Sequence, residues 1–411
     1  MKTDLDALMQ ENNIDVLLVN GPGFHNPAMV YLTGGAHITR AELIKKHSQQ
    51  PVIFCGVMER DEAAKTGLPV RLYSDYPYTE QLREAGGDAE LAAAITLRKQ
   101  LTDLGITSGR VAIYGRVEVG PLYARLQRVA KMLPELEFTG FVNDPIFFRA
   151  MMTKDADEID RIRRMGKITT EVVGRTADFL AGQRVENGVL IKDDGHPLTV
   201  ADVKGKIDLW LAELGAANPE GTIFAIGRDA GVPHSSGTAT DLMRLGQTIV
   251  FDIFPCEAGG GYFYDFTRTW CLGYASDEAQ ELYEQVLQAY REVVAGLRVN
   301  QNFQEAQTRT CDLFEELGHT TIRSQPDASE GYIHSVGHGV GLNIHEMPFS
   351  GASATPADSL APGTVFTIEP GLYYPSRNMG VRIEDTYATR PDGTFEVLAG
   401  YPYDLVLPIR S

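Results

Sequence analysis

Four acidic side chains end or interrupt apolar segments in the C-terminal part of the chain, and this pattern restricts the fold more than any other. Asp252 follows three apolar residues, and Glu369 ends another strand-like segment. Asp265 and Glu384 stand in similar segments of their own. A buried carboxylate is very costly unless it is paired with a cation. These acids therefore need partners, which are either basic side chains or metal ions.

A glycine-rich segment, residues 259–261, separates Asp252 from Asp265. Two strands joined by such a turn can hold both carboxylates on one face of a sheet. Like charges side by side repel, so a metal ion between them is one solution. An ion pair of either acid with Arg268 or Arg244 is the other.

The two glutamates follow the same logic. Strand alternation places Val365 and Glu369 on one face, and Arg382 and Glu384 on one face of a later strand. Glu384 is therefore either a metal ligand or the partner of Arg382 or Arg390.

Histidines gather between residues 334 and 345, where three of the nine in the chain occur: His334, His338 and His345. Glycines alternate with other residues from 337 to 341, which disfavours a helix and predicts a closely packed extended backbone. Imidazole is the commonest metal ligand and a frequent proton carrier. Four acids with one histidine suit two divalent ions such as Mn²⁺, Co²⁺ or Zn²⁺.

The 411 residues exceed the size at which one core stops growing, so two domains are expected. Residues 1–150 alternate strands and helices, which predicts an α/β domain with strands that include 14–19 and 30–33. Residues 151–411 place helices before clustered strands, which predicts an α+β domain. Its first helix should begin after Asp155, with Glu158 completing a capping box.

Charge and composition exclude several classes of protein. Lys and Arg number 37 against 55 Asp and Glu, a net charge of −18, which argues against a nucleic-acid partner and against binding to anionic membranes. No run of apolar residues is long enough for a membrane span. The four scattered cysteines and the polar N-terminus predict a cytoplasmic location.

Taken in order, these segments resemble the pita-bread metallopeptidases, the group of prolidase, Xaa-Pro aminopeptidase and methionine aminopeptidase. The matching motifs are Asp252 followed by residues 265–269, then residues 334–341, 367–371 and 381–385. More weakly, residues 1–150 are similar to the creatinase/prolidase-type N-terminal domain, best at residues 30–34. The resemblance implies a pita-bread catalytic domain behind that N-terminal domain.

The resemblance also implies a set of metal ligands for two divalent ions. Asp265 and Glu384 would bind both ions, Asp252 would bind one, and His338 and Glu369 the other. All five residue types stand at the positions of this sequence where the motifs require them.

Further roles follow from the same resemblance. Glu369 would also move the proton from the attacking water toward the leaving nitrogen, and His345 would stabilise the oxyanion. His234 and His334 would position the substrate, while Arg382 would orient a bridging carboxylate.

The resemblance implies hydrolysis of peptides with proline at the second position, by a dipeptidase, and it implies a homodimer. Alternatives are an aminopeptidase for longer peptides, a metal-free hydrolase of the creatinase kind and a non-catalytic binding module. Two departures bear on specificity. Phe254 replaces the family's usual glycine in a lengthened loop. The arginine that holds the dipeptide carboxylate in typical prolidases is missing after His345, and the next arginine, Arg377, is either its substitute or an ordinary surface residue.

Overall fold

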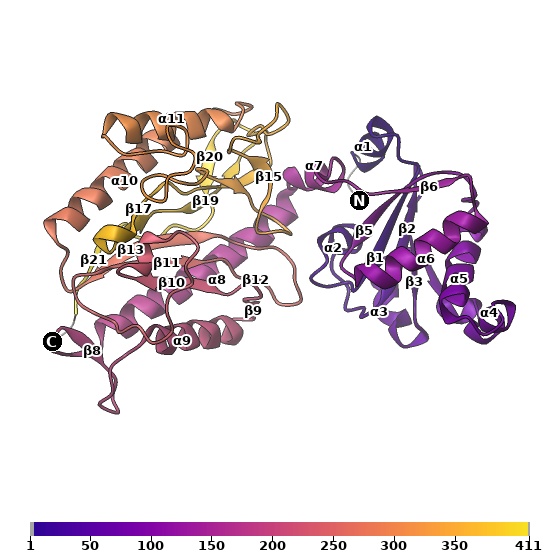
Figure 1. Cartoon of the computed structure of the whole chain (residues 1–411), viewed down its shortest axis with the longest axis horizontal. Coiled ribbons are helices and arrows are strands. Elements are labelled where there is room, and N and C mark those ends of the chain that lie inside the picture. Colours follow the sequence, from indigo (N-terminus) through magenta and orange to yellow (C-terminus); the bar gives the residue numbers. More distant parts are fainter. Residues whose placement is uncertain (1–3, 410–411) are drawn as a thin grey trace. The chain divides into compact units, whose positions relative to one another are not determined.

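The protein is described by a computed structural model that covers residues 4–409. It divides into two compact units (Figure 1). The first unit runs to Met151 and includes the three glycines Gly259–Gly261. The second unit contains the rest of the chain.

The first unit is built around a six-stranded mixed sheet in the order β4-β3-β2-β1-β5-β6. Its strands are β1 (Val16–Gly21), β2 (Ala41–Lys46), β3 (Val52–Cys55), β4 (Val70–Leu72), β5 (Gly109–Gly115) and β6 (Leu136–Thr139). The pairs β1–β5, β5–β6 and β3–β4 are parallel, whereas β2 runs antiparallel to both of its neighbours.

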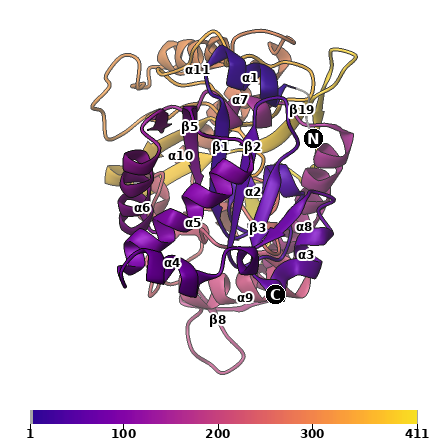
Figure 2. The same ribbon diagram turned by 90° about the vertical axis from the view of Figure 1, so that its right-hand side faces the viewer.

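Helices cover both faces of this sheet. Those of the unit are α1 (Leu5–Glu11), α2 (Pro27–Thr33), α3 (Arg60–Ala64), α4 (Tyr78–Glu84), α5 (Ala89–Asp103), α6 (Val119–Met132) and α7 (Phe147–Met152). Figure 2 looks onto the face that α5 and α6 cover. Their apolar side chains, such as Leu97 and Val129, pack with Leu18 and Val111 of the sheet in one core.

The strand expected at residues 30–33 is wrong, because this segment belongs to α2. Pro27 occupies the first turn, where its missing N–H costs nothing. Gly34 ends the helix in the left-handed conformation, with φ of 79°. The helix is buried on nearly all sides, so its short apolar run lacks the polar face that distinguishes a helix from a strand.

The second unit begins with a long helix, α8 (Ala156–Ala181). Asp155 accepts from the backbone of Glu158, whose side chain accepts from the backbone of Asp155, so the expected capping box is present. The other helices are α9 (Val200–Glu213), α10 (Asp277–Ala295) and α11 (Gln304–Glu316).

Two sheets carry the chemistry of this unit. One has the order β10-β11-β13-β21 and the other β15-β14-β16-β19-β20. Their strands are β10 (Thr222–Ile226), β11 (Thr248–Ile253), β13 (Phe266–Leu272), β14 (His338–Gly339), β15 (Glu346–Phe349), β16 (Val365–Ile368), β19 (Asp385–Thr389), β20 (Phe395–Val397) and β21 (Val406–Leu407). All of their pairings are antiparallel except that of β13 with β21.

Short two-stranded sheets complete the unit. They are β7 (Arg184–Glu186) with β8 (Val189–Ile191), β9 (Ala216–Ala217) with β12 (Cys256–Glu257), and β17 (Gly371–Tyr374) with β18 (Met379–Arg382).

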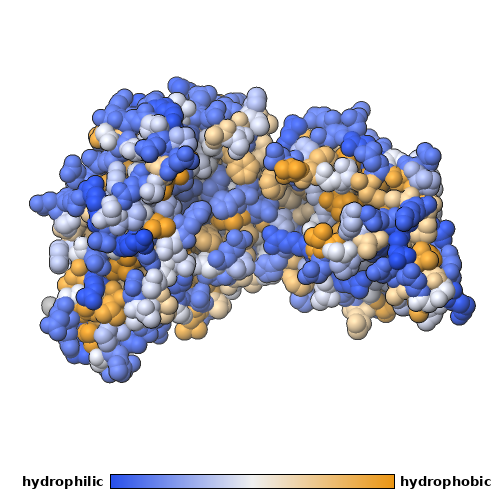
Figure 3. Space-filling view, in the orientation of Figure 1, coloured by the Kyte–Doolittle hydropathy of each residue, from blue (hydrophilic) through white to orange (hydrophobic). Residues whose placement is uncertain are grey.

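Hydrophilic and hydrophobic residues are interspersed on the face drawn in Figure 3. Within residues 4–409, no helix combines the length and apolarity that a membrane span requires.

Candidate metal centre

The five residues expected to bind metal line one cavity of about 600 Å³ in the second unit. Each stands in or next to a strand. Asp252 lies in β11, Asp265 directly precedes β13, His338 opens β14, Glu369 follows β16, and Glu384 lies between β18 and β19.

Strand register brings three of the acids together. The antiparallel pairing of β11 with β13 sets Asp252 opposite Thr267, two residues beyond Asp265. The backbone N–H of Glu384 donates to the carbonyl of Thr267 at 3.1 Å, and the Thr267 hydroxyl donates to Oε2 of Glu384 at 2.7 Å. Thr267 thus holds Glu384 beside both aspartates.

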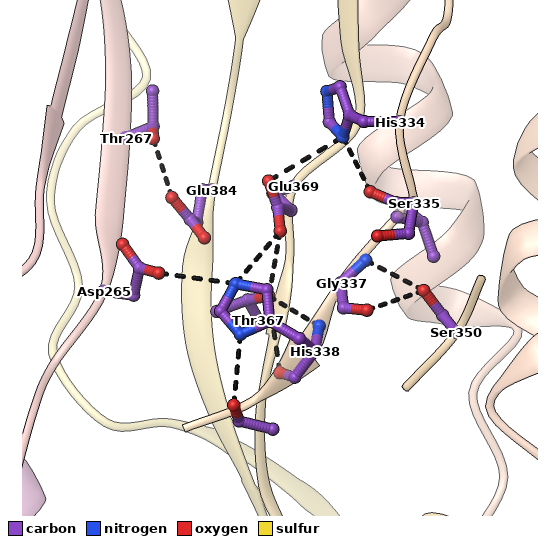
Figure 4. A network of polar contacts seen from close by, with 12 residues as sticks. Asp265, Thr267, His334, Ser335, Gly337, His338, Ser350, Thr367, Glu369 and Glu384 are labelled. Carbon is purple, nitrogen blue, oxygen red and sulfur yellow. Dashed lines mark hydrogen bonds and ion pairs between the residues drawn. The ribbon is translucent and has the colours of Figure 1, made fainter. Parts of the chain in front are cut away.

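His338 faces the acids through Nε2, as Figure 4 shows. This nitrogen lies 3.5 Å from Oδ2 of Asp265 and 3.3 Å from Oε1 of Glu369. Nδ1 lies 3.1 Å from the carbonyl oxygen of Gly339. A carbonyl only accepts, so Nδ1 carries the hydrogen and Nε2 is the nitrogen that can bind a metal.

The glycines around His338 allow backbones to approach closely, as the sequence predicts. A Cβ on Gly337 would lie 2.1 Å from the carbonyl oxygen of Thr367. A Cβ on Gly339 would lie 2.0 Å from that of Met347. The spacing of the glycines therefore seats His338 between β15 and β16.

Burial makes this concentration of negative charge costly. It raises the pKa values of Asp265 and Glu384 well above their usual range, and the neighbouring carboxylates raise them further. The pKa of Asp252 is also raised by burial, although the guanidinium of Arg382 opposes this. Burial opposes protonation of His338, but Glu369 and Asp265 outweigh it and raise the ring's pKa to about 9. The site therefore attracts positive charge.

The donor set fits metal ions. Asp265, His338 and Glu384 each offer one ligand atom, and these atoms lie within 4.8 Å of one another. Among the described residues, Oδ1 of Asp252 is buried without a hydrogen-bond partner. Carboxylate oxygens with one imidazole are suitable ligands for divalent transition metals.

Arg382 is the basic residue that pairs with this set. Its Nη2 donates to Oδ2 of Asp252 at 2.5 Å, and its Nε donates to the hydroxyl of Thr267 at 3.2 Å. Arg268, an alternative partner considered for the aspartates, instead pairs with Asp385 at 2.8 Å.

Three more histidines line the cavity. Burial lowers the pKa of His334, whose Nδ1 donates to the carbonyl of Ser335 at 2.7 Å. The centre of the His345 ring lies 4.3 Å from that of the His338 ring. The pKa of His345 is lowered, mainly by burial and secondly by the charge of His338. His234 is exposed on its loop. The rings of His334 and His345 therefore present neutral donors and acceptors to the cavity.

Similarity to known proteins shows which protein family the chain belongs to. The model of metallopeptidase family M24 matches residues 160–391, more than half of the chain. The chain belongs to metallopeptidase family M24. The prediction of a peptidase is confirmed by this membership.

Relatives and solved structures extend the similarity beyond the family M24 segment. The chain is 26% identical over 419 residues to the Xaa-Pro dipeptidase of Lactobacillus helveticus, covering 99% of each chain. It is 28% identical over 299 residues to the probable dipeptidase PepE of Mycobacterium tuberculosis, covering 72% of each. A dipeptidase structure from Pyrococcus horikoshii matches with a TM-score of 0.75 and 22% identity over 98% of both chains. The predicted two-part pita-bread fold is confirmed.

One residue singled out in the sequence lies elsewhere in this M24 member. Arg377 is absent from the described lining of the cavity. Its guanidinium pairs with Glu278 and lies 4.7 Å from the centre of the Tyr374 ring. The structure does not bring Arg377 to the other candidate residues.

Sequence reasoning overlooked three residues of this M24 site. The sequence spacing could have revealed Thr267, because it stands two residues after Asp265 and so on the same strand face. No sequence pattern marks Tyr373 or Lys204 as part of the site. Tyr373 contacts the site through Arg382, and Lys204 reaches the cavity from α9.

Proposed function

We propose that this chain is an Xaa-Pro dipeptidase that uses two divalent metal ions. The observation that carries the proposal is the convergence of five ligand-type residues on one cavity: Asp252, Asp265, His338, Glu369 and Glu384. The full-length relative named Xaa-Pro dipeptidase supports the substrate class.

The ions are Mn²⁺, Co²⁺ or Zn²⁺, since carboxylates and one imidazole accept all three. When bound, two such ions supply an activated water at neutral pH and polarise the scissile carbonyl.

Glu369 is suited to move the proton. Its side chain is largely buried, and its oxygens lie 3.3 Å from Nε2 of His338 and 3.9 Å from Nδ1 of His334. The pKa of Glu369 is lowered to about 2 because His338 outweighs the effect of burial, so the carboxylate is ionised.

The histidines are suited to bind the peptide. His345 and His234 face the cavity, where a ring N–H can donate to the oxygen on which negative charge develops. His334 has its Nδ1–H fixed by Ser335 and its Nε2 by Tyr373, so its orientation is set before substrate arrives.

Apolar side chains next to these carboxylates and histidines favour binding of a proline ring. Ile223, Phe254, Ile344 and Phe349 line the same cavity. A proline ring buries apolar surface there, and its nitrogen carries no hydrogen that would need an acceptor.

The test is hydrolysis of Ala-Pro, Ala-Pro-Ala and Ala-Ala by metal-stripped enzyme, with and without Mn²⁺. The proposal predicts Mn²⁺-dependent cleavage of Ala-Pro, with much slower cleavage of the other two. Preferential cleavage of Ala-Pro-Ala would make the chain an aminopeptidase. Metal binding without cleavage of any proline peptide would overturn the substrate class.

We also propose that residues 1–150 form the N-terminal domain, that residues 151–411 form the catalytic domain, and that the chain is a homodimer. Calorimetry should then resolve two unfolding transitions rather than one. Light scattering should give twice the mass of one 45.1 kDa chain.

A further inference from the structure

A dipeptide differs from a longer peptide at one end of the cavity, because its proline carries a free carboxylate. An enzyme that prefers dipeptides needs a cation there, since burying an unpaired carboxylate is costly. Apart from histidines, the described residues that line the cavity include two cationic side chains, Arg382 and Lys204.

Arg382 is already committed. Its Nη2 donates to Asp252 at 2.5 Å, its Nη1 to Tyr373 at 2.7 Å, and its Nε to Thr267 at 3.2 Å. The guanidinium is buried, with 4% of the side chain exposed. A substrate carboxylate would have to displace one of these partners to reach it.

Lys204 has the opposite properties. It lies on α9 and is half-buried, and Nζ donates to the carbonyl of Ser236 at 3.0 Å. An ammonium has three N–H donors, so two remain. Within residues 4–409, no carboxylate forms an ion pair with Lys204, and Glu220, which also lines the cavity, is not within ion-pair distance.

The position of Lys204 connects it to the substrate end of the site. Ser236 lies two residues beyond His234, and all three residues line the cavity. Partial burial lowers the pKa of Lys204, with Asp208 opposing the shift, so the ammonium gains from an anionic ligand.

We propose that Lys204 binds the C-terminal carboxylate of the dipeptide and thereby determines the preference for dipeptides. The proposal rests on the function proposed above. It assigns to α9 the role for which the sequence offered Arg377.

The experiment compares kcat/KM for Ala-Pro with that for Ala-Pro amide, whose C-terminus is uncharged. We expect wild-type enzyme to prefer Ala-Pro by roughly 10-fold or more, as for a hydrogen bond to a charged group. Lys204→Met should bring this ratio close to one, mainly by raising KM for Ala-Pro. Lys204→Arg, which keeps the charge, should restore part of the preference.

Lys206→Met is the matched control, because Lys206 lies on the same helix, is exposed and is absent from the described lining. It should keep the wild-type ratio. A wild-type ratio in Lys204→Met, or wild-type enzyme that cleaves both substrates equally, would overturn the role of Lys204 alone. Failure of wild-type enzyme to cleave either substrate would overturn the proposed function and this inference with it.

Discussion

The hydroxyl of Tyr373 accepts a hydrogen bond from Nη1 of Arg382 at 2.7 Å. The same hydroxyl donates to Nε2 of His334 at 2.8 Å. Because Arg382 also holds Asp252, Tyr373 connects a proposed metal ligand to a histidine that faces the substrate cavity.

Tyr373→Phe should remove this connection and leave the packing of the ring intact. Loss of a hydrogen bond to a charged group costs about 1.5–3 kcal/mol, so kcat/KM for Ala-Pro should fall about 10- to 100-fold. Steady-state kinetics with saturating Mn²⁺ measures this.

Tyr374→Phe is the control, because the neighbouring hydroxyl bonds to His319 rather than to the site. It should leave the kinetics close to those of wild type. Unchanged kinetics in Tyr373→Phe would show that the connection has no role in the reaction.

The sequence reveals the five proposed ligands but not Tyr373, and the reason is physical. A carboxylate at the end of an apolar strand is costly wherever the strand packs, so Asp252 and Glu369 stand out locally. Tyr373 is an ordinary aromatic residue in an apolar strand. Only the pairing of β17 with β18, which sets it opposite Gly380 and near Arg382, gives it a partner.

In the fold, too, elements that depend on neighbouring residues are predictable, and elements that depend on distant partners are not. The start of α8 follows from a capping box, which depends on two residues only three positions apart. Strand β2 was not expected, since Glu42 and Lys45 interrupt its apolar pattern. Both are buried because they pair with residues distant in the sequence, Glu42 with Arg125 and Lys45 with Asp6.

Asp385→Asn should strongly destabilise the second unit. Its carboxylate and the guanidinium of Arg268 are both fully buried, 2.8 Å apart, and Tyr403 donates to the same carboxylate at 2.7 Å. Breaking a buried pair from one side costs about 3–5 kcal/mol. Urea unfolding of metal-free protein measures the change without a contribution from bound ions.

Glu396→Gln provides the comparison for this pair. Glu396 pairs with Arg390 and Arg163, whose side chains are 49% and 28% exposed, so the cost should be only about 1 kcal/mol. Equal losses of unfolding free energy in the two variants would contradict a larger contribution of the buried Arg268–Asp385 pair to stability.

His319 should make stability depend on pH. Burial, assisted by Arg377, lowers its pKa, and the ring accepts at Nδ1 from the hydroxyl of Tyr374 at 2.6 Å. The unfolded chain has a His pKa of about 6.5, so below that pH it binds a proton that the folded chain excludes. The stability from His319 is thus present above about pH 6.5 and is lost as pH falls through the folded pKa.

Urea midpoints at pH 7.5 and pH 5.5 should show this for wild type and His319→Gln. The stability advantage of wild type should be smaller at pH 5.5. His196→Gln, at an exposed position, is the control for the loss of one histidine from the chain. An advantage that widens on acidification would contradict the sign of the shift.

The most direct test of the metal centre is the number of Mn²⁺ ions that metal-stripped protein binds, measured by isothermal titration calorimetry. Wild type should bind two ions per chain, and Glu384→Gln, which alters a residue proposed to bind both, should bind fewer and more weakly. Binding of no Mn²⁺ by folded wild type, or unchanged binding by Glu384→Gln, would contradict a dinuclear centre at Asp252, Asp265, His338, Glu369 and Glu384.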